Sequence, residues 1–430
     1  MQFLKVSDNK RYLTYADASP FLWIGDTAWQ LFHSLNYEEA EYYLKKRAEQ
    51  GFNVVQAVTL AELSGVTAAN ANGDLPLIPD SDGSFSKAEP DLRGESNYWT
   101  HVDRIIDLAA DYGIYVALLP TWGDKWNAMG KNGPELLNGE NAYSYGTFLA
   151  ERYGERPNII WVLQGDRPLF KRVHFEVHTG LARAIRERAN PAHLITAHPP
   201  GHESSSTFFH EEEWLDFNMI QSSHGSLNLP TYEFVAKDRA LEPTKPTFDA
   251  EPRYEDHPIN FKPEMGYFDD YDVRQACYWA VFAGGLGVTY GHHSVWAMVT
   301  EPTPYWPLVW QEALDRPGAL QMQHLRSVVE SVNFQTGEPR QDLLQTELTG
   351  ANYTAVFAGE GFLLAYSPNG LAFELDLKGL AGLGADTAAA QWMNPRTGAF
   401  SENIEVTGRF TPPSAGRNND WVLVLKGQGE

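Results

Sequence analysis

The chain has 430 residues, a net charge of −23 at pH 7 and an aromatic content of 13%. Its length favours one large domain followed by a smaller one, and its negative charge argues against nucleic acids and anionic membrane surfaces as partners. Cys277 is the only cysteine, which excludes an intrachain disulfide and a thiolate metal site. No apolar stretch reaches transmembrane length, and the polar first ten residues show no signal peptide, so we expect a cytoplasmic protein unless a signal was trimmed.

The first part of the chain predicts strands that alternate with helices. Two short runs, residues 3–6 and 12–15, flank an Asp8-Asn9 turn and predict a hairpin. A polar insertion over residues 61–96 is rich in Gly, Asn, Asp and Pro, and a loop of this length is usually functional or mobile. Apolar runs and helical periodicity predict the strands 21–24, 52–58 and 114–120 and the helices 37–50 and 99–112.

The same alternation continues through residue 332. Nearly every predicted strand ends in polar or aromatic residues, whereas an open doubly wound sheet gathers its site at one switch point. Eight strands with helices between them, over about 330 residues, match a (β/α)8 TIM barrel, which we assign to residues 1–333 with its N-terminal hairpin. The strands in this part are residues 159–163, 194–198, 217–221, 246–252 and 287–293, and the helices are residues 142–153, 175–189, 232–239, 273–283 and 319–332.

From residue 334 the pattern changes to short apolar or alternating runs separated by Gly, Asn and Pro. No helical pattern of useful length follows, so residues 334–430 are predicted to form an antiparallel β-sandwich domain. Because only a short connection joins it to the barrel, we expect this domain to cover barrel surface. Its predicted strands are residues 353–358, 362–367, 373–377, 388–393 and 421–425.

Two carboxylates occupy strand ends that a barrel would bring together. Asp166 follows a buried strand through Gly165, and Glu251 ends the seventh predicted strand. Barrel enzymes carry their catalytic residues at the carboxyl ends of strands, and glycoside hydrolysis needs two carboxyl groups across one opening. Asp166 could instead be a helix N-cap, and Glu251 could be a surface loop residue that precedes a proline.

The surroundings of the two carboxylates indicate different roles. The hydrophobic strand before Asp166 would raise the pKa of its carboxyl group, which suits a general acid. Arg253 and His257 lie near Glu251 in the sequence, and a positive neighbour would keep Glu251 ionised, as a nucleophile must be. We therefore predict Asp166 as the acid/base and Glu251 as the nucleophile, with a carboxyl separation of roughly 5 Å.

Other polar and aromatic residues near the strand ends are candidate sugar ligands. Tryptophans can form stacking walls for sugars, although any one tryptophan is more often a core residue. Asp26 and Gln56 could bind hydroxyl groups or could equally cap loops. The predicted substrate-binding residues are Asp26, Trp29, Gln56, Trp122, His198, Gln221, His224, His292 and Trp296.

Histidines near several strand ends suggest metal catalysis as a competing hypothesis. Metal-dependent barrels commonly open with a His-x-His pair on the first strand, whereas this chain reads Gly25-Asp26-Thr27 there. The adjacent His292 and His293 would point to opposite faces of a strand and would rarely chelate one ion. The chain also lacks the G-x-S-x-G, P-loop and G-x-G-x-x-G motifs. We therefore expect neither a metal nor a cofactor.

A set of motifs is spread over the predicted barrel. The set comprises Arg11-Tyr12-Leu13, Pro20-Phe21-Leu22-Trp23-Ile24-Gly25-Asp26-Thr27-Ala28-Trp29, Gly51-Phe52-Asn53-Val54-Val55-Gln56, Trp161-Val162-Leu163-Gln164-Gly165-Asp166 and the strand end Glu251-Pro252. Taken together, these motifs resemble the apiosidase-like glycoside hydrolases of family 140. Residues 391–398 also resemble the β-sandwich that often follows these barrels, which has been labelled collagen-binding, a label that we do not carry over.

The resemblance implies a retaining glycosidase with an aspartate acid/base and a glutamate nucleophile, roles that fall on Asp166 and Glu251. It also implies a carbohydrate substrate, with release of apiose-linked sugars, notably from side chains of the pectic polysaccharide rhamnogalacturonan-II. Residues 61–96 hold no motif that matches the family. Two other functions stay open at this point: a non-catalytic carbohydrate-binding barrel and a metal-dependent hydrolase.

Overall fold

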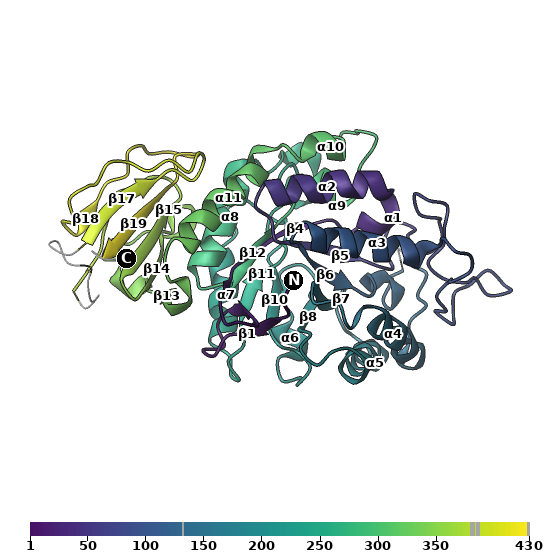
Figure 1. Cartoon of the computed structure of the whole chain (residues 1–430). Helices are drawn as coiled ribbons and strands as arrows, with labels where there is room; N and C mark the ends of the chain where they lie inside the picture. Colours follow the sequence, from purple (N-terminus) through teal and green to yellow (C-terminus); the bar gives the residue numbers. More distant parts are fainter. Residues whose placement is uncertain (131–132, 379–382, 384–387, 428–430) are drawn as a thin grey trace.

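The computed structural model describes residues 1–130, 133–378, 383 and 388–427. Figure 1 shows a larger unit that carries the N-terminus and a smaller unit, in green to yellow, that carries the C-terminus. Within the described ranges, no helix combines the length and the apolar character needed to cross a membrane.

The larger unit is a TIM-like barrel, which confirms the predicted fold class. Parallel strands pair in the order β8-β7-β6-β5-β4-β12-β11-β10, and the short strand β9 adds antiparallel to β10. Each strand of this sheet is short and almost wholly buried, as expected for strands covered on both faces. The strands are β4 (Trp23–Thr27), β5 (Val54–Val58), β6 (Tyr115–Leu119), β7 (Ile159–Gln164), β8 (Ile195–His198), β9 (Glu203–Ser204), β10 (Asn218–Gln221), β11 (Thr247–Asp249) and β12 (Gly287–Tyr290).

Hydrogen bonds bridge the seam of the barrel between β8 and β10. The backbone N–H of Asp216 donates to the carbonyl of Ile195 at 2.9 Å, and the Asp216 carboxylate accepts from the Ile195 N–H at 2.6 Å. The hydroxyl of Thr196 donates to the carbonyl of Phe217 at 2.7 Å. The carboxyl ends of all eight strands therefore face one opening.

The helices surround the sheet, and polar caps define where several of them begin. The side chains of Asn36, Asn97, Asn138 and Asp269 each accept from the backbone of the first turn in a capping box. The long helices are α2 (Tyr37–Glu49), α3 (Tyr98–Asp111), α4 (Gly139–Tyr153), α5 (Arg172–Arg188), α7 (Thr231–Arg239), α8 (Asp270–Phe282) and α11 (Pro317–Glu330). The short ones are α1 (Leu31–Ser34), α6 (Ser206–Phe209), α9 (His293–Trp296) and α10 (Trp310–Ala313), with 3-10 turns at η1 (Gly123–Lys125), η2 (Ile259–Phe261), η3 (Pro263–Met265), η4 (Phe334–Thr336), η5 (Gln341–Leu343) and η6 (Gly350–Asn352).

Aromatic side chains fill the inside of the barrel. The ring of Trp23 lies 4.8 Å from that of Phe248, and Phe217 lies 6.0 Å from Phe248. The indole N–H of Trp23 donates to the hydroxyl of Thr289 at 3.0 Å. A Cβ atom at Gly25 would lie 2.5 Å from that indole nitrogen, which explains the glycine within β4. The interior is therefore a packed layer that supports the opening, as in other TIM barrels.

The smaller unit is built from antiparallel strands, and the N-terminus adds a small sheet to the barrel. A five-stranded sheet has the order β13-β14-β15-β19-β17, and β16 pairs with β18. These strands are β13 (Glu338–Pro339), β14 (Ala355–Gly359), β15 (Phe362–Ser367), β16 (Phe373–Glu374), β17 (Ala388–Met393), β18 (Arg409–Phe410) and β19 (Trp421–Gly427). The predicted N-terminal hairpin is confirmed as β1 (Leu4–Val6) and β2 (Leu13–Tyr15), to which β3 (Pro20–Phe21) adds a third strand.

The smaller unit packs against α8 through a continuous apolar core. Buried side chains of α8 and of the five-stranded sheet belong to the same hydrophobic cluster, and the rings of Tyr278 and Tyr366 stack with centroids 4.7 Å apart. At the edge of this interface the guanidinium of Arg274 bonds both carboxylate oxygens of Asp420, at 3.0 and 2.9 Å, with both side chains fully buried. The smaller unit thus covers barrel surface, as expected from the short connection.

Candidate active site

The strand β7 ends in a left-handed turn that carries Asp166. Gln164, Gly165 and Asp166 have φ values of 76°, 90° and 58°, and non-glycine residues adopt this region only where the surroundings hold them there. Gly123 N–H donates to the Gly165 carbonyl at 2.8 Å, and the indole of Trp126 donates to the Gln164 carbonyl at 3.1 Å. A side chain at position 165 would lie 2.9 Å from backbone atoms of the loop after β6. The neighbouring loop therefore determines the direction in which Asp166 leaves its strand.

Glu251 follows β11 by two residues and is held by the neighbouring strand end. Its carbonyl accepts from Ser223 N–H at 3.0 Å, and its own N–H donates to Asp249 at 3.4 Å. The Asp249 carboxylate also accepts from the backbone and hydroxyl of Ser222. Burial raises the pKa of Asp249 to about 6, although these hydrogen bonds oppose the shift. The end of β11 is thus tied to the end of β10.

Two histidines from other strands contact the carboxylate of Glu251. His224 Nε2 lies 3.1 Å from Oε1, and His198 Nε2 lies 2.9 Å from Oε2. The His224 contact is a well-aligned hydrogen bond, whereas the His198 contact has ion-pair distance without hydrogen-bond alignment. Nδ1 of His224 accepts from the Tyr254 N–H at 3.3 Å, so the proton of the neutral ring lies on Nε2 and is donated to Glu251.

The pKa values of the two carboxyl groups are shifted in opposite directions. Burial by itself would raise the pKa of Glu251, but the contacts from His198 and His224 outweigh burial and hold it well below its usual range. Burial and then the negative charge of Glu251 raise the pKa of Asp166, which Arg167 only partly offsets. Asp166 keeps 27% of its side-chain surface exposed, so its proton can exchange with a ligand. One group is therefore favoured as an acid and the other as an anion.

Asp166 and Glu251 line the same cavity, whose volume is about 420 Å³. This size lies in the range typical of small-ligand sites. Five of the predicted sugar ligands lie in the cavity wall, namely Trp29, Trp122, Gln221, His224 and Trp296. His198 contacts Glu251 but does not line the cavity. The cavity is lined by Trp29, Glu62, Trp122, Asp166, Gly201, His202, Gln221, Ser223, His224, Glu251, Tyr254, His257, Phe261, Trp296 and Tyr305.

Asp26 is a predicted sugar ligand that the structure places away from the cavity. Its carboxylate is fully buried and accepts from the hydroxyl of Tyr43 at 2.6 Å and from Nε of Arg47 at 2.7 Å. Both partners come from α2, on the outside of the barrel wall. Asp26 therefore joins a helix to the sheet and does not face the opening.

Gln56 and His292 are also placed differently from the prediction. Gln56 is buried inside the barrel, where its amide donates to the carbonyl of Ala250 at 3.1 Å. The ring of His292 contacts the Asp256 carboxylate at 3.0 Å and accepts from Ser294 N–H at 3.0 Å, which caps α9. Neither side chain lines the cavity: Gln56 lies within the barrel interior, and both ring nitrogens of His292 are engaged by Asp256 and by the cap of α9.

The positive neighbours predicted for Glu251 also differ from those observed. Arg253 is buried and donates to the carbonyls of Asp272 and Leu229 and to the side chain of Gln275. Burial, followed by the nearby rings of His224 and His293, lowers the pKa of His257 far below its usual value, so this ring is neutral. Residues distant in sequence hold Glu251 ionised, whereas its sequence neighbours do not.

Several residues of the cavity wall were not selected from the sequence. Tyr254 and His257 follow Glu251 within six residues. Their position directly after a catalytic strand end could have predicted that they line the cavity. Glu62 stands four residues after β5 at the start of the polar insertion, which was noted only as a long loop. Ser223 directly precedes the predicted ligand His224 after β10, whereas Gly201, His202, Phe261 and Tyr305 come from loops and a 3-10 turn whose path no local pattern predicts.

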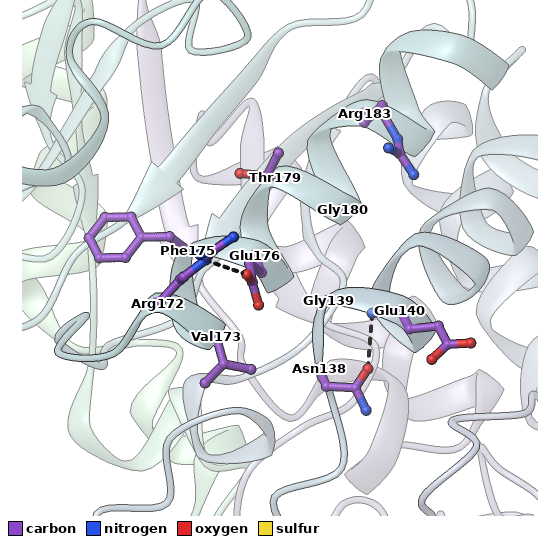
Figure 2. Close-up of a pocket in the computed structure, with 10 residues that line it drawn as sticks. All are labelled: Asn138, Gly139, Glu140, Arg172, Val173, Phe175, Glu176, Thr179, Gly180 and Arg183. Carbon is purple, nitrogen blue, oxygen red and sulfur yellow. Dashed lines mark hydrogen bonds and ion pairs between the residues drawn. The ribbon is translucent and has the colours of Figure 1, made fainter.

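A second hollow lies between the start of α4 and residues 172–183 of α5 (Figure 2). Figure 2 shows the ion pair between Arg172 and Glu176, whose charged atoms lie 2.7 Å apart. It also shows the helix cap in which the N–H of Glu140 donates to the side-chain oxygen of Asn138. None of its lining residues comes from a barrel strand end. It therefore lacks the pair of strand-end carboxyl groups that the central cavity has.

Within the part of the chain that the structure describes, no group of three or more His, Cys, Asp or Glu side chains is arranged to hold a metal ion. Several histidines near the opening are instead engaged with carboxylates or with each other. His224 and His257 stack with ring centroids 4.2 Å apart, and His257 packs edge-on against His293 at 4.4 Å.

Comparison with known proteins identifies the two units of the chain. The family model described as "Apiosidase-like, catalytic domain" matches residues 7–336, and the one described as "Putative collagen-binding domain of a collagenase" matches residues 339–426. A structure of a glycoside hydrolase family 5 from Bacteroides vulgatus ATCC 8482 is 32% identical with a TM-score of 0.89, covering 100% of this chain and 93% of that one. A structure named "Glycoside hydrolase" has the same identity and TM-score, with 100% and 98% covered.

A more distant likeness concerns the fold alone. A family 39 glycoside hydrolase from the gut symbiont Bacteroides cellulosilyticus WH2 is 11% identical with a TM-score of 0.54, covering 96% of this chain and 87% of that one. The comparison with curated proteins found no match. Since the apiosidase-like model covers most of the chain and two structures agree with it over the full length, the chain belongs to the apiosidase-like family and is a glycoside hydrolase.

Proposed function

We propose that the chain is a retaining glycosidase in which Asp166 is the acid/base and Glu251 is the nucleophile. The observation that carries this proposal is the opposite pKa shift of two carboxyl groups in the wall of one cavity. Paired titratable groups whose environments separate their pKa values are characteristic of acid and base assignments in enzymes.

The reaction would proceed by double displacement. In the first step the Glu251 carboxylate attacks the anomeric carbon, the bond to the leaving oxygen breaks, and Asp166 gives its proton to that oxygen. In the second step Asp166 takes a proton from water, the water oxygen bonds to the anomeric carbon, and Glu251 leaves. His198 and His224 would favour the anionic form of Glu251 that both steps need.

For the substrate we propose an apiosyl linkage in a plant-type glycan, such as a pectic side chain. The support is the match of the apiosidase-like family model to residues 7–336. Trp296, which is half-buried in the cavity wall, offers a flat apolar face of the kind that stacks on sugar rings, and the nearly buried Trp29 and Trp122 border the same space.

The test is a screen of aryl glycosides that includes the apioside, with the anomeric configuration of the first product followed by NMR. We expect hydrolysis with retained configuration, and inverted product would contradict the nucleophile role of Glu251. Asp166→Asn and Glu251→Gln should each abolish turnover without changing the melting temperature by more than a few degrees. Full activity in either variant would reject the assignment, and no hydrolysis of any glycoside would reject the proposed function.

A further inference from the structure

Glu62 lies in the wall of the catalytic cavity, and its backbone is held next to two tryptophans of that wall. Its carbonyl accepts from the side-chain amide of Gln30 at 3.0 Å, and Gln30 directly follows Trp29. Two residues before Glu62, the carbonyl of Leu60 accepts from Trp122 N–H at 3.0 Å. The position of Glu62 is therefore coupled to both tryptophans, whose rings lie 5.0 Å apart.

The side chain of Glu62 makes no hydrogen bond or ion pair with the other described residues, although it is only partly exposed. Two further atoms of the same wall lack partners in the described structure: Nε1 of Trp122, in a side chain that is 3% exposed, and Oε1 of Gln221, in one that is 4% exposed. Buried polar groups without partners are costly unless a ligand or solvent satisfies them. Those two atoms have almost no accessible surface of their own, so the carboxyl group of Glu62 is the unpaired polar group that borders the cavity.

The charges around Glu62 favour its protonated form. Burial, and then the carboxylates of Asp166, Asp124 and Glu251, raise the pKa of Glu62 to about 8, while Arg167 opposes them. Lys125, which is close enough to be affected by Glu62, is engaged with both oxygens of Asp124 at 2.7 and 2.8 Å. At neutral pH the carboxyl group of Glu62 can therefore both donate and accept a hydrogen bond.

We propose that Glu62 binds hydroxyl groups of the sugar ring that lies between Asp166 and Glu251, and that it thereby helps to determine which sugar the cavity accepts. Hydroxyl groups match a protonated carboxyl group, which can both donate and accept, in a wall that also carries aromatic side chains. A metal ion does not match it, since the described acidic side chains form no cluster that could hold one. This inference rests on the proposed function, because it assumes that a sugar occupies the space between the two catalytic carboxyl groups.

The test compares Glu62→Ala and Glu62→Gln with the wild type and with Glu89→Ala, an exposed glutamate of the same insertion. The probe is the 4-nitrophenyl glycoside that the wild type hydrolyses fastest at pH 6.5. For Glu62→Ala we expect KM to rise about tenfold or more while kcat changes little, as for a lost hydrogen bond to substrate. Glu62→Gln, which keeps a donor and an acceptor, should stay within about threefold of the wild type. Glu89→Ala should match the wild type.

A second measurement separates this inference from the proposed function. Free D-apiose, L-arabinose, D-mannose and D-galactose are titrated while tryptophan fluorescence is followed, because Trp29 and Trp122 flank the site. Weaker binding in Glu62→Ala, restored in Glu62→Gln, supports the role of Glu62 even if no glycoside is hydrolysed. Three results would overturn the role of Glu62. Glu62→Ala could match the wild type in both KM and sugar binding, or both Glu62 variants could lose binding equally. The third is a wild type that binds none of these sugars.

Discussion

Nε2 of His224 lies 3.1 Å from Oε1 of Glu251 and donates to it, because the opposite nitrogen of the ring already accepts from a backbone N–H. This relationship joins residues from the ends of β10 and β11. It stabilises the carboxylate form of Glu251 within a buried site, where an unpaired anion would be costly. The hydrogen bond thus counteracts the burial that would otherwise protonate the proposed nucleophile.

Removal of the His224 donor should raise the pKa of Glu251. The carboxylate form would then be lost at higher pH, so the acidic limb of the kcat/KM profile of His224→Ala should move upward by about one pH unit or more. His224→Gln, which retains an N–H donor, should shift it less. The measurement is kcat/KM on an aryl glycoside from pH 8 down to the lowest pH at which both proteins stay folded, and an unchanged acidic limb in His224→Ala would contradict the role.

Asp166 and Glu251 should differ in their dependence on the leaving group. A 2,4-dinitrophenolate leaves without protonation. In Asp166→Ala the rate of the first step should therefore fall about tenfold or less on the 2,4-dinitrophenyl glycoside, but more than about a thousandfold on an alkyl glycoside. Glu251→Ala should lose more than about a thousandfold on both, since it lacks the nucleophile. Rates of release of the two leaving groups measure this. The reverse pattern would exchange the two roles.

Asp26 should matter for stability and not for sugar binding. In Asp26→Ala the fully buried guanidinium of Arg47 would lose its ionic partner, which typically costs about 3 to 5 kcal/mol. Chemical denaturation measures this loss, with KM unchanged at 25 °C. The control is Asp315→Ala. It removes the exposed ionic partner of Lys46, which neighbours Arg47 on α2, and should be as stable as the wild type. A raised KM in a stably folded Asp26→Ala variant would restore the role as a sugar ligand.

The raised pKa of Glu62 predicts a pH-dependent stability difference. The folded-state pKa of Glu62, about 8, exceeds the ordinary value of 4.5. The contribution of protonated Glu62 to the stability of the fold is therefore fully present below about pH 4.5 and is lost as the pH rises through about 8. Glu62→Gln stays neutral and should gain stability relative to the wild type over this window, by about one to two degrees in Tm because the side chain is partly solvated. Scanning calorimetry at pH 5 to 9 tests this, and a constant difference would contradict the shift.

The interface between the two units should make them unfold together. Asp420→Ala would leave Arg274 without its buried partner and should lower the stability of the whole chain by about 3 kcal/mol, with kcat unchanged at 25 °C. Glu374→Ala, which removes an exposed ion pair with Arg409 in the smaller unit, is the matched control. Calorimetry should show one transition in the wild type. Two separate transitions would show that the shared core does not couple the units.

Local patterns in the sequence were sufficient to predict the barrel, the small antiparallel unit and the strand ends that carry Asp166 and Glu251. Apolar runs bounded by glycine and polar residues identify buried strands, and connectivity then places their carboxyl ends at one opening. The family motifs agree with this prediction, because most of them lie on or next to the strands. The roles of the two carboxyl groups stay predictions until the variants are measured.

Only the tertiary structure decided which polar side chains face the opening. Successive side chains of a strand point to opposite faces, and a strand buried on both faces carries no alternation from which to determine their direction. Asp26 therefore pointed to α2 although it stands in a family motif, whereas Glu62, from an insertion without any matching motif, faces the cavity. The histidine partners of Glu251 come from strand ends 27 and 53 residues away in sequence, and such long-range contacts depend on the closed barrel.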